Sequence, residues 1–174
     1  MEETARSNVR EVKLWYAVLG RGSLALLFAV LVMSDPFGGL GGLAKLFALY
    51  ALADGALALY AARRVRRTHT VERGPVLLVE GIVNVAVAVL VLAIPTVAAL
   101  RVLGGVRALA IGASEVLWSR RGNASDLVEL GGIAAVGLGL LVLAWPGPGD
   151  LAMRWLLGLV AFVSGGLAFG GGLS

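Results

Sequence analysis

Cysteine is absent from this chain of 174 residues, and histidine occurs once, at His69. No disulfide, thiolate metal site or cysteine nucleophile can therefore form, and no site can use two histidines. Charge is also scarce, because only 15% of the residues are Asp, Glu, Lys or Arg. The sequence has no Ser-His-Asp, HExxH or Gly-x-Ser-x-Gly pattern. We therefore expect no enzyme activity, no metal and no cofactor.

Apolar residues are what the sequence has in excess. Hydrophobic residues make up 59% of the chain, and 25 further residues are glycine. A soluble domain averages about 45–50% apolar residues with glycine included. Too few polar side chains remain to cover a water-facing surface, so we expect a lipid bilayer as the outer solvent. The net charge of +4 does not indicate nucleic-acid binding, because the arginines cluster between apolar runs.

One apolar stretch occurs three times in the chain. Its copies are RGSLALLFAVLVMSDP at Arg21–Pro36, EGIVNVAVAVLVLAIP at Glu80–Pro95 and GGIAAVGLGLLVLAWP at Gly131–Pro146. In each copy one glycine, Gly22, Gly81 or Gly132, precedes the proline by fourteen residues. A repeat of this size indicates tandem supersecondary units.

Six apolar segments follow a polar tail at residues 1–13. We expect helices at about 14–34, 41–62, 75–94, 97–118, 127–145 and 151–170. About 20 residues, at 1.5 Å each, cross the roughly 30 Å hydrocarbon core, and a helix satisfies its own backbone hydrogen bonds there. The prediction is an all-α, integral membrane six-helix bundle over residues 14–174. It is built from three tandem two-helix hairpin repeats, at about 14–67, 73–121 and 124–174.

Lysine and arginine are unevenly divided between the two ends of this predicted bundle. One end carries Arg6, Arg10, Lys13, Arg63, Arg64, Arg66, Arg67, Arg73, Arg120 and Arg121. The other end carries Lys45, Arg101 and Arg154. Two arginine-bearing linkers, Arg63–Gly74 and Ser119–Ser125, separate the hairpins. Because loops rich in Lys and Arg stay in the cytoplasm, we expect both termini and these arginine linkers on that side, N-in and C-in.

Parts of the repeat resemble the HdeD family of bacterial acid-resistance membrane proteins, which are six-helix proteins of three short repeats. The matching residues are Arg21–Gly22 with Pro36, YALADG at Tyr50–Gly55, LLVEG at Leu77–Gly81 with Pro95, and Gly131–Gly132 with WPG at Trp145–Gly147. The resemblance covers roughly residues 14–170. It implies a multi-pass protein of the bacterial inner membrane with a role in surviving acid stress. The third copy departs from the pattern, with Gly131 where the first two have Arg21 and Glu80.

Five charged residues stand out within the predicted helices, away from the Lys and Arg counted above. They are Arg21, Asp54, Glu80, Arg107 and Glu115. A charge in hydrocarbon costs about 2.5–3.5 kcal/mol on insertion scales, so such groups face a partner or water. Arg21 and Glu80 share a repeat position and hence a depth, so we expect them to pair, directly or through Asp54 or Asn84. Two interpretations stay open. In the first, the charges pair and hold the hairpins together. In the second, they form a polar pocket, and because three carboxylates face only two arginines, the carboxylate without a partner takes up a proton at low pH.

Small residues spaced four apart indicate close helix packing in membranes. Gly104, Ala108 and Gly112 form one such stripe, and Gly166 and Gly170 form another. The repeat glycines Gly22, Gly81 and Gly132 are further positions where we expect another helix to come close. These positions predict contacts within the bundle or, for residues 151–170, contact with a second copy or another membrane protein.

The sequence favours a non-enzymatic inner-membrane protein, associated with stress by its resemblance, that acts through packing or by binding a partner. The alternative is a small transporter or channel with its polar site at Arg21, Asp54, Glu80 and Arg107. A hydrated cavity reaching both faces would favour transport, and a dry, paired interior would favour packing.

Overall fold

The computed structural model describes residues 19–34, 38–66, 74–120, 126–145 and 149–173, and every regular element in these ranges is a helix. The N-terminal helix runs over Leu19–Ser34. The others are α2 (Gly39–Arg66), α3 (Gly74–Ala93), α4 (Val97–Trp118), α5 (Asp126–Ala144) and α6 (Asp150–Leu173). All six predicted helices are therefore present, and their bounds lie within a few residues of the predicted ones. The predicted tail at 1–13, residues 14–18 and His69 lie outside the described residues.

The end of α2 is the clearest difference from the predicted bounds, because the helix continues to Arg66 instead of ending near residue 62. Arginine is a good helix former, and cations near a helix C-terminus interact favourably with its dipole. The guanidinium carbon of Arg64 also lies 5.2 Å from the ring centroid of Tyr60, one turn earlier. The first part of the predicted arginine linker is therefore the last turn of α2.

Two short connections show how the sequence sets the helix boundaries. Gly38 and Gly39 have φ angles of 57° and 67°, which place them in a backbone region that glycine enters without steric cost. Between α3 and α4, Pro95 cannot donate a backbone hydrogen bond, and Thr96 caps the next helix. The Thr96 hydroxyl accepts a hydrogen bond of 3.1 Å from the backbone N–H of Ala99.

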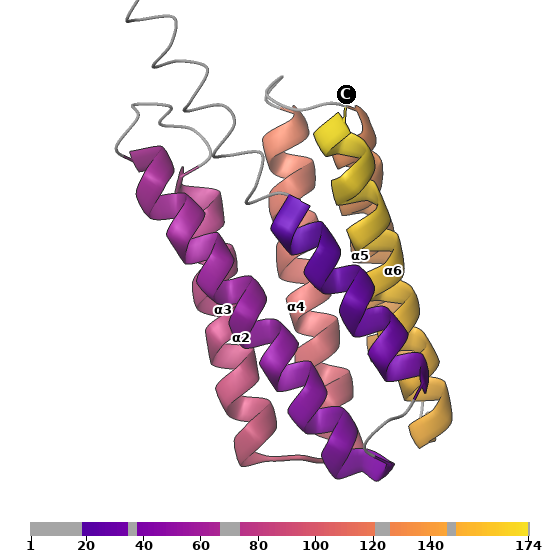
Figure 1. The fold of residues 1–174 in the computed structure, drawn as a ribbon. Coiled ribbons are helices and arrows are strands. Elements are labelled where there is room, and N and C mark those ends of the chain that lie inside the picture. The colour runs from indigo at the N-terminus through magenta and orange to yellow at the C-terminus, as the bar shows by residue number, and fades with distance from the viewer. Residues whose placement is uncertain (1–18, 35–37, 67–73, 121–125, 146–148, 174) are drawn as a thin grey trace, which may run out of the picture.

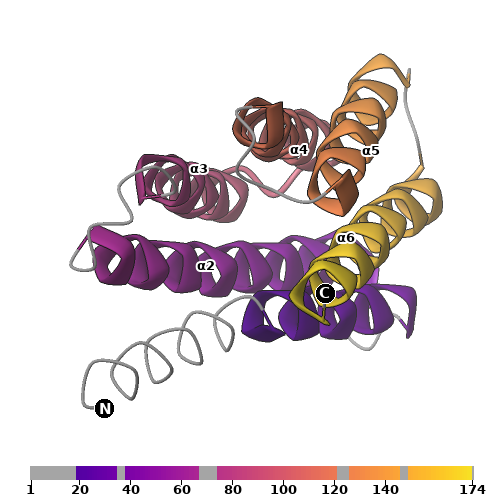
Figure 2. The ribbon, with the colours of Figure 1, turned by 90° about the horizontal axis from the view of Figure 1, so that it is seen from above.

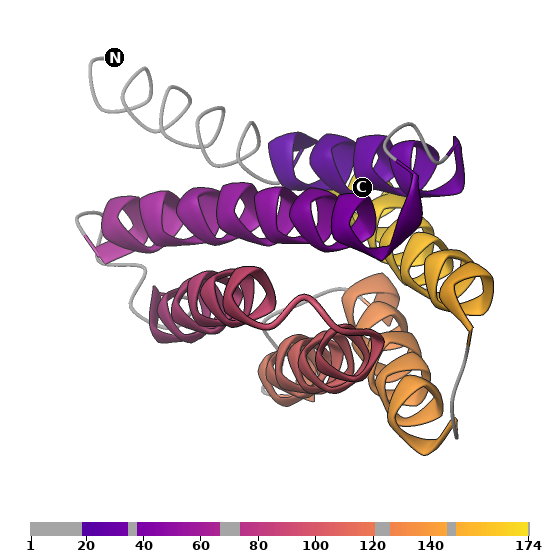
Figure 3. The ribbon, with the colours of Figure 1, turned by 90° about the horizontal axis from the view of Figure 1, so that it is seen from below.

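The helices alternate in direction along the bundle (Figure 1). We call the end where α2, α4 and α6 begin the lower end, and the opposite end, where these three helices finish, the upper end. The end-on views show the N-terminal helix beside α2 and α6, so that the first and last helices are neighbours (Figures 2 and 3). The bundle is therefore closed by contact between the N-terminal helix and α6.

Among α2 to α6, the most extensive helix contacts join α2 to α3 and α4 to α5. The pairs α3–α4 and α5–α6, which the sequence predicts as tight hairpins, are also neighbours but share smaller interfaces. The larger interfaces therefore connect helices on either side of an arginine linker. Glycine accounts for this, because both large interfaces have glycine facing the partner backbone.

The interior is apolar and aromatic, and so is the outer surface. Phe28 stacks on Tyr50 with ring centroids 4.3 Å apart, and its edge meets Phe47. Large apolar side chains such as Leu49, Leu117 and others on every helix point outward. In water such a surface would be unfavourable, whereas lipid accommodates it.

Three of the described helices are long and apolar enough to cross a membrane. They are Gly39–Val65, Gly74–Ala93 and Val97–Trp118. Three shorter apolar helices lie at Leu19–Ser34, Val128–Ala144 and Leu151–Gly166. Their length and composition are therefore compatible with an all-α membrane protein.

Candidate functional site

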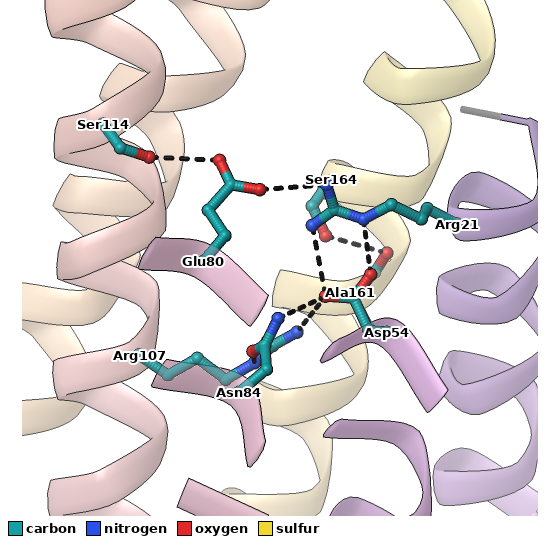
Figure 4. Close-up of polar contacts among 8 residues, drawn as sticks. All are labelled: Arg21, Asp54, Glu80, Asn84, Arg107, Ser114, Ala161 and Ser164. Carbon is teal, nitrogen blue, oxygen red and sulfur yellow. Dashed lines mark hydrogen bonds and ion pairs between the residues drawn. The ribbon is translucent and has the colours of Figure 1, made fainter. Parts of the chain in front are cut away.

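Arg21 binds two carboxylates that belong to two other helices (Figure 4). Its Nε donates to Asp54 Oδ1 at 2.6 Å, and its Nη2 donates to Asp54 Oδ2 at 3.3 Å. Its Nη1 donates to Glu80 Oε2 at 2.9 Å. A single guanidinium from the N-terminal helix thus connects α2 to α3.

A second arginine, Arg107 of α4, also binds Asp54. Its Nη2 donates to Asp54 Oδ2 at 3.0 Å, and its Nε donates to Asn84 Oδ1. The Asn84 amide in turn donates to Asp54 Oδ2 at 2.8 Å. The guanidinium carbon of Arg107 lies 4.8 Å from the ring centroid of Tyr50, a cation–π distance. Asp54 is therefore shared by two arginines and one amide.

Glu80 has a second contact, to a hydroxyl on α4. Ser114 Oγ lies 3.1 Å from Glu80 Oε1 and 2.7 Å from the backbone carbonyl oxygen of Ile111. A hydroxyl carries one hydrogen, so it can donate to only one of these oxygens at a time. Ser114 therefore adds a weaker, exchangeable link between α3 and α4.

These contacts form one polar network across four helices. Its members are Arg21, Asp54, Glu80, Asn84, Arg107 and Ser114. Two arginines balance two carboxylates, so the network is electrically neutral. The side chains of Asp54 and Glu80 are each 5% exposed, and that of Arg21 is 21% exposed. Neutrality and hydrogen bonding offset the cost of placing charge in a medium of low dielectric constant.

The glycine that follows each carboxylate explains why the network can assemble. A Cβ added to Gly81 would lie 3.1 Å from the carbonyl oxygen of Gly55 and 2.6 Å from Leu59 Cγ. A Cβ added to Gly55 would lie 3.0 Å from Asn84 Cβ. The Asp-Gly and Glu-Gly pairs therefore let α2 and α3 approach closely at the level of their acidic side chains.

The other two repeat glycines make contacts that resemble this one. A Cβ on Gly132 would lie 2.8 Å from the carbonyl oxygen of Gly112, between α4 and α5. A Cβ on Gly165 would lie 3.0 Å from the carbonyl oxygen of Gly22, between α6 and the N-terminal helix. The three repeat glycines thus each face a glycine of a different helix. Neither of the last two contacts has a carboxylate beside its glycines.

The other glycines that the sequence predicts as packing positions differ in how closely another helix approaches them. Gly104 faces α6, because an added Cβ would lie 3.3 Å from Leu157 Cδ2. Gly166 has open space around it, with no atom within 4 Å of an added Cβ. Gly170 lies in the last turns of α6, where the structure describes the backbone alone. Gly55 and Gly165 are close-packed positions that the sequence reasoning did not select, although Gly55 follows Asp54 directly.

Glu115 is placed differently from the other four charges. It is half-buried near the end of α4 and has an interaction of its own. Sequence reasoning missed Ser114, a member of the network, and Tyr50, whose ring contacts Arg107. Their spacing could have indicated them, because Tyr50 lies four residues before Asp54 and Ser114 lies seven after Arg107, each on the same helix face.

The space beside the network is small. A cavity of about 10 Å³ lies against Tyr50 and Arg107 and is otherwise lined by residues such as Phe28, Phe47 and Leu157. That volume is about the least that holds one water molecule. Among the described residues, no group of three or more His, Asp or Glu side chains gathers as a metal site. The geometry therefore suits mutual neutralisation of charges better than ligand capture.

Comparison with known proteins identifies a repeat and no specific relative. No curated protein matches the chain, and no solved structure does. Residues 20–93 match a protein family described as a short repeat of unknown function, DUF308. The matched segment runs from the N-terminal helix to the end of α3 and contains Arg21, Asp54, Glu80 and Asn84. Over these residues the chain is therefore similar to the DUF308 short-repeat family.

Proposed function

We propose that this chain is a non-enzymatic integral membrane protein that acts through helix packing or by binding a partner in the membrane. The observation that carries the proposal is the closed pairing of charges, in which Asp54 serves both arginines and Glu80 binds Arg21. A transport site must release its ligand and admit water. Here the carboxylates are bound by protein donors, and the adjoining cavity has a volume of about 10 Å³.

We further propose that the six helices form three hairpin repeats in a bacterial inner membrane, with both termini in the cytoplasm. The glycine contacts Gly22–Gly165, Gly55–Gly81 and Gly112–Gly132 support a threefold relation, because each joins a helix of one repeat to a helix of the next. The excess of Lys and Arg that the sequence assigns to one side of the predicted bundle supports the orientation. The resemblance to the HdeD family suggests a role in acid stress.

A flux measurement separates the packing role from the alternative of a transporter or channel. The protein is reconstituted into sealed vesicles that contain a pH-sensitive dye, and a pH gradient is applied. We expect proton flux no greater than in empty vesicles, for the wild type and for Asp54→Asn alike. Flux in the wild type that Asp54→Asn abolishes would establish transport and overturn the packing proposal.

Survival of the native bacterium at low pH tests the proposed stress role separately. Cells lacking the protein should survive acid exposure less well than cells that carry it. A variant with a destabilised network, Asp54→Asn, should restore survival less well than Lys45→Gln, whose side chain is exposed and outside the network. Equal survival with and without the protein would remove the stress role and leave the packing proposal intact.

A further inference from the structure

The small cavity beside the polar network lies where matching faces of α2, α4 and α6 meet. Three glycines mark corresponding positions on these helices, because each contacts a repeat glycine of another helix: Gly55, Gly112 and Gly165. The residues five and eight positions before these glycines all line the cavity; they are Tyr50, Arg107 and Val160, and Phe47, Gly104 and Leu157. Under the threefold relation proposed above, the cavity therefore lies between equivalent positions of the three repeats.

One wall of this cavity is polar. Of the described residues that line it, Tyr50 and Arg107 have polar side chains, and the others are glycine or apolar. Both polar residues are buried, with exposed fractions of 8% and 7%. The guanidinium of Arg107 lies against the face of the Tyr50 ring. The cavity therefore has a polar wall on α2 and α4, and its walls on α5 and α6 are apolar.

Hydrogen-bond donors are in excess at the polar wall. Arg107 donates through Nε to Asn84 and through Nη2 to Asp54, which uses two of the five N–H donors of a guanidinium. The described contacts of Tyr50 are its stacking on Phe28 and its ring face against Arg107. A guanidinium has no acceptor, so Arg107 cannot take the hydrogen of the Tyr50 hydroxyl. A buried tyrosine hydroxyl usually has a hydrogen-bond partner, and this wall therefore needs a small acceptor.

The size of the cavity limits what this acceptor is. Its volume is about 10 Å³, and about 10–15 Å³ on this scale is the least that holds one water molecule. Chloride and the oxyanions are larger than water. Buried cavities that stay dry are lined by apolar groups, whereas buried water bonds to polar groups that lack another partner. A single water molecule therefore fits both the volume and the donors of the wall.

We propose that this cavity binds one water molecule between the guanidinium of Arg107 and the hydroxyl of Tyr50. The water oxygen accepts one hydrogen bond from each side chain, because it has two lone pairs. Two hydrogen bonds lie within the range of 2–4 that is typical of buried water. The water extends the polar network from Arg107 to Tyr50, at the point where α2, α4 and α6 meet.

A crystal structure of the full chain, at a resolution that shows ordered water, tests the site directly. The wild type should have one density peak in the cavity, within about 2.7–3.2 Å of Tyr50 Oη and of an Arg107 nitrogen. Tyr50→Phe keeps the ring contacts and removes the hydroxyl, so the peak should be lost. Tyr60→Phe is the matched control and should keep the peak, because Tyr60 is also on α2 with an arginine against its ring but is 53% exposed and outside the cavity.

Gly104→Ala tests the same site without changing a polar group. Its added Cβ would lie 3.3 Å from Leu157 Cδ2 and 3.8 Å from Phe47 Cζ, two side chains that line the cavity, so the methyl group should displace the water. A wild-type cavity without density would overturn the proposal, and so would an undiminished peak in Tyr50→Phe or Gly104→Ala. Crystals soaked in bromide separate water from an anion, because an anomalous peak in the cavity would assign the site to an anion and refute water.

Discussion

Gly81 of α3 lies directly against Gly55 of α2: a Cβ on Gly81 would be 3.1 Å from the Gly55 carbonyl oxygen and 2.6 Å from Leu59 Cγ. The Gly55 backbone cannot move aside without shifting α2. We therefore expect Gly81→Ala to lower the free energy of unfolding by about 1–3 kcal/mol, the usual cost of overpacking. Chemical or thermal unfolding in detergent measures the change.

Gly166→Ala is the matched control for Gly81→Ala. Both positions are helical, but an added Cβ at Gly166 meets no atom within 4 Å. Alanine also has a higher helix propensity than glycine, so this variant should be as stable as the wild type or slightly more stable. Similar losses at the two positions would show that the α2–α3 contact is not specially close.

Asp54→Asn should destabilise the protein more than Glu80→Gln does. Asp54 binds both Arg21 and Arg107, whereas Glu80 binds Arg21 and the Ser114 hydroxyl. Neutralising Asp54 leaves Arg107 without its carboxylate, and uncompensated buried charge costs about 3–5 kcal/mol. Comparing the unfolding free energies of the two isosteric variants checks the order, and the reverse order would place the centre of the network at Glu80.

Arg21 and Glu80 should show coupling in a double-mutant cycle. Arg21→Met removes the guanidinium that binds Glu80, and Glu80→Gln removes one of the two carboxylates that bind Arg21. Each single change should destabilise the protein, by about 3–5 kcal/mol for Arg21→Met, and the double variant should lose less than the sum. Strictly additive losses, measured by thermal unfolding in detergent, would mean that the ion pair contributes no interaction energy.

Reporter fusions test the proposed topology of six spans with both termini inside. Fusions at His69 and Asn123 should report the cytoplasm, and a fusion at Gly149 should report the opposite side. The expectation follows from the ten Lys and Arg residues on one side against three on the other. A fusion at His69 that reads outside would invert the orientation.

The apolar repeat determines the helices of this protein before any tertiary contact is considered. Each run has the length of a membrane span, and the prolines and glycines between the runs end one helix and allow the next to begin. The helix predicted at 75–94 shows that the length of an apolar run outweighs the β propensity of its residues. It is rich in β-branched residues, yet α3 is helical from Gly74 to Ala93, as its length predicts. The first part of the arginine linker escaped prediction, because arginine is compatible with either a helix or a loop.

The sequence by itself also placed Arg21 and Glu80 at one depth, since they occupy the same position of the repeat. Depth restricts which charges can meet, but it does not say which helices are neighbours. Only the tertiary structure decided that Asp54 lies between two arginines, with Asn84 donating to it. The same is true of the contacts of Arg107 with the Tyr50 ring and of Ser114 with Glu80. The physical reason is that Asp54 and Glu80 meet only because Gly55 and Gly81 let α2 and α3 approach closely. How closely two helices approach depends on the side chains on both sides of their interface. The repeat pattern of a single segment does not say which two segments form that interface.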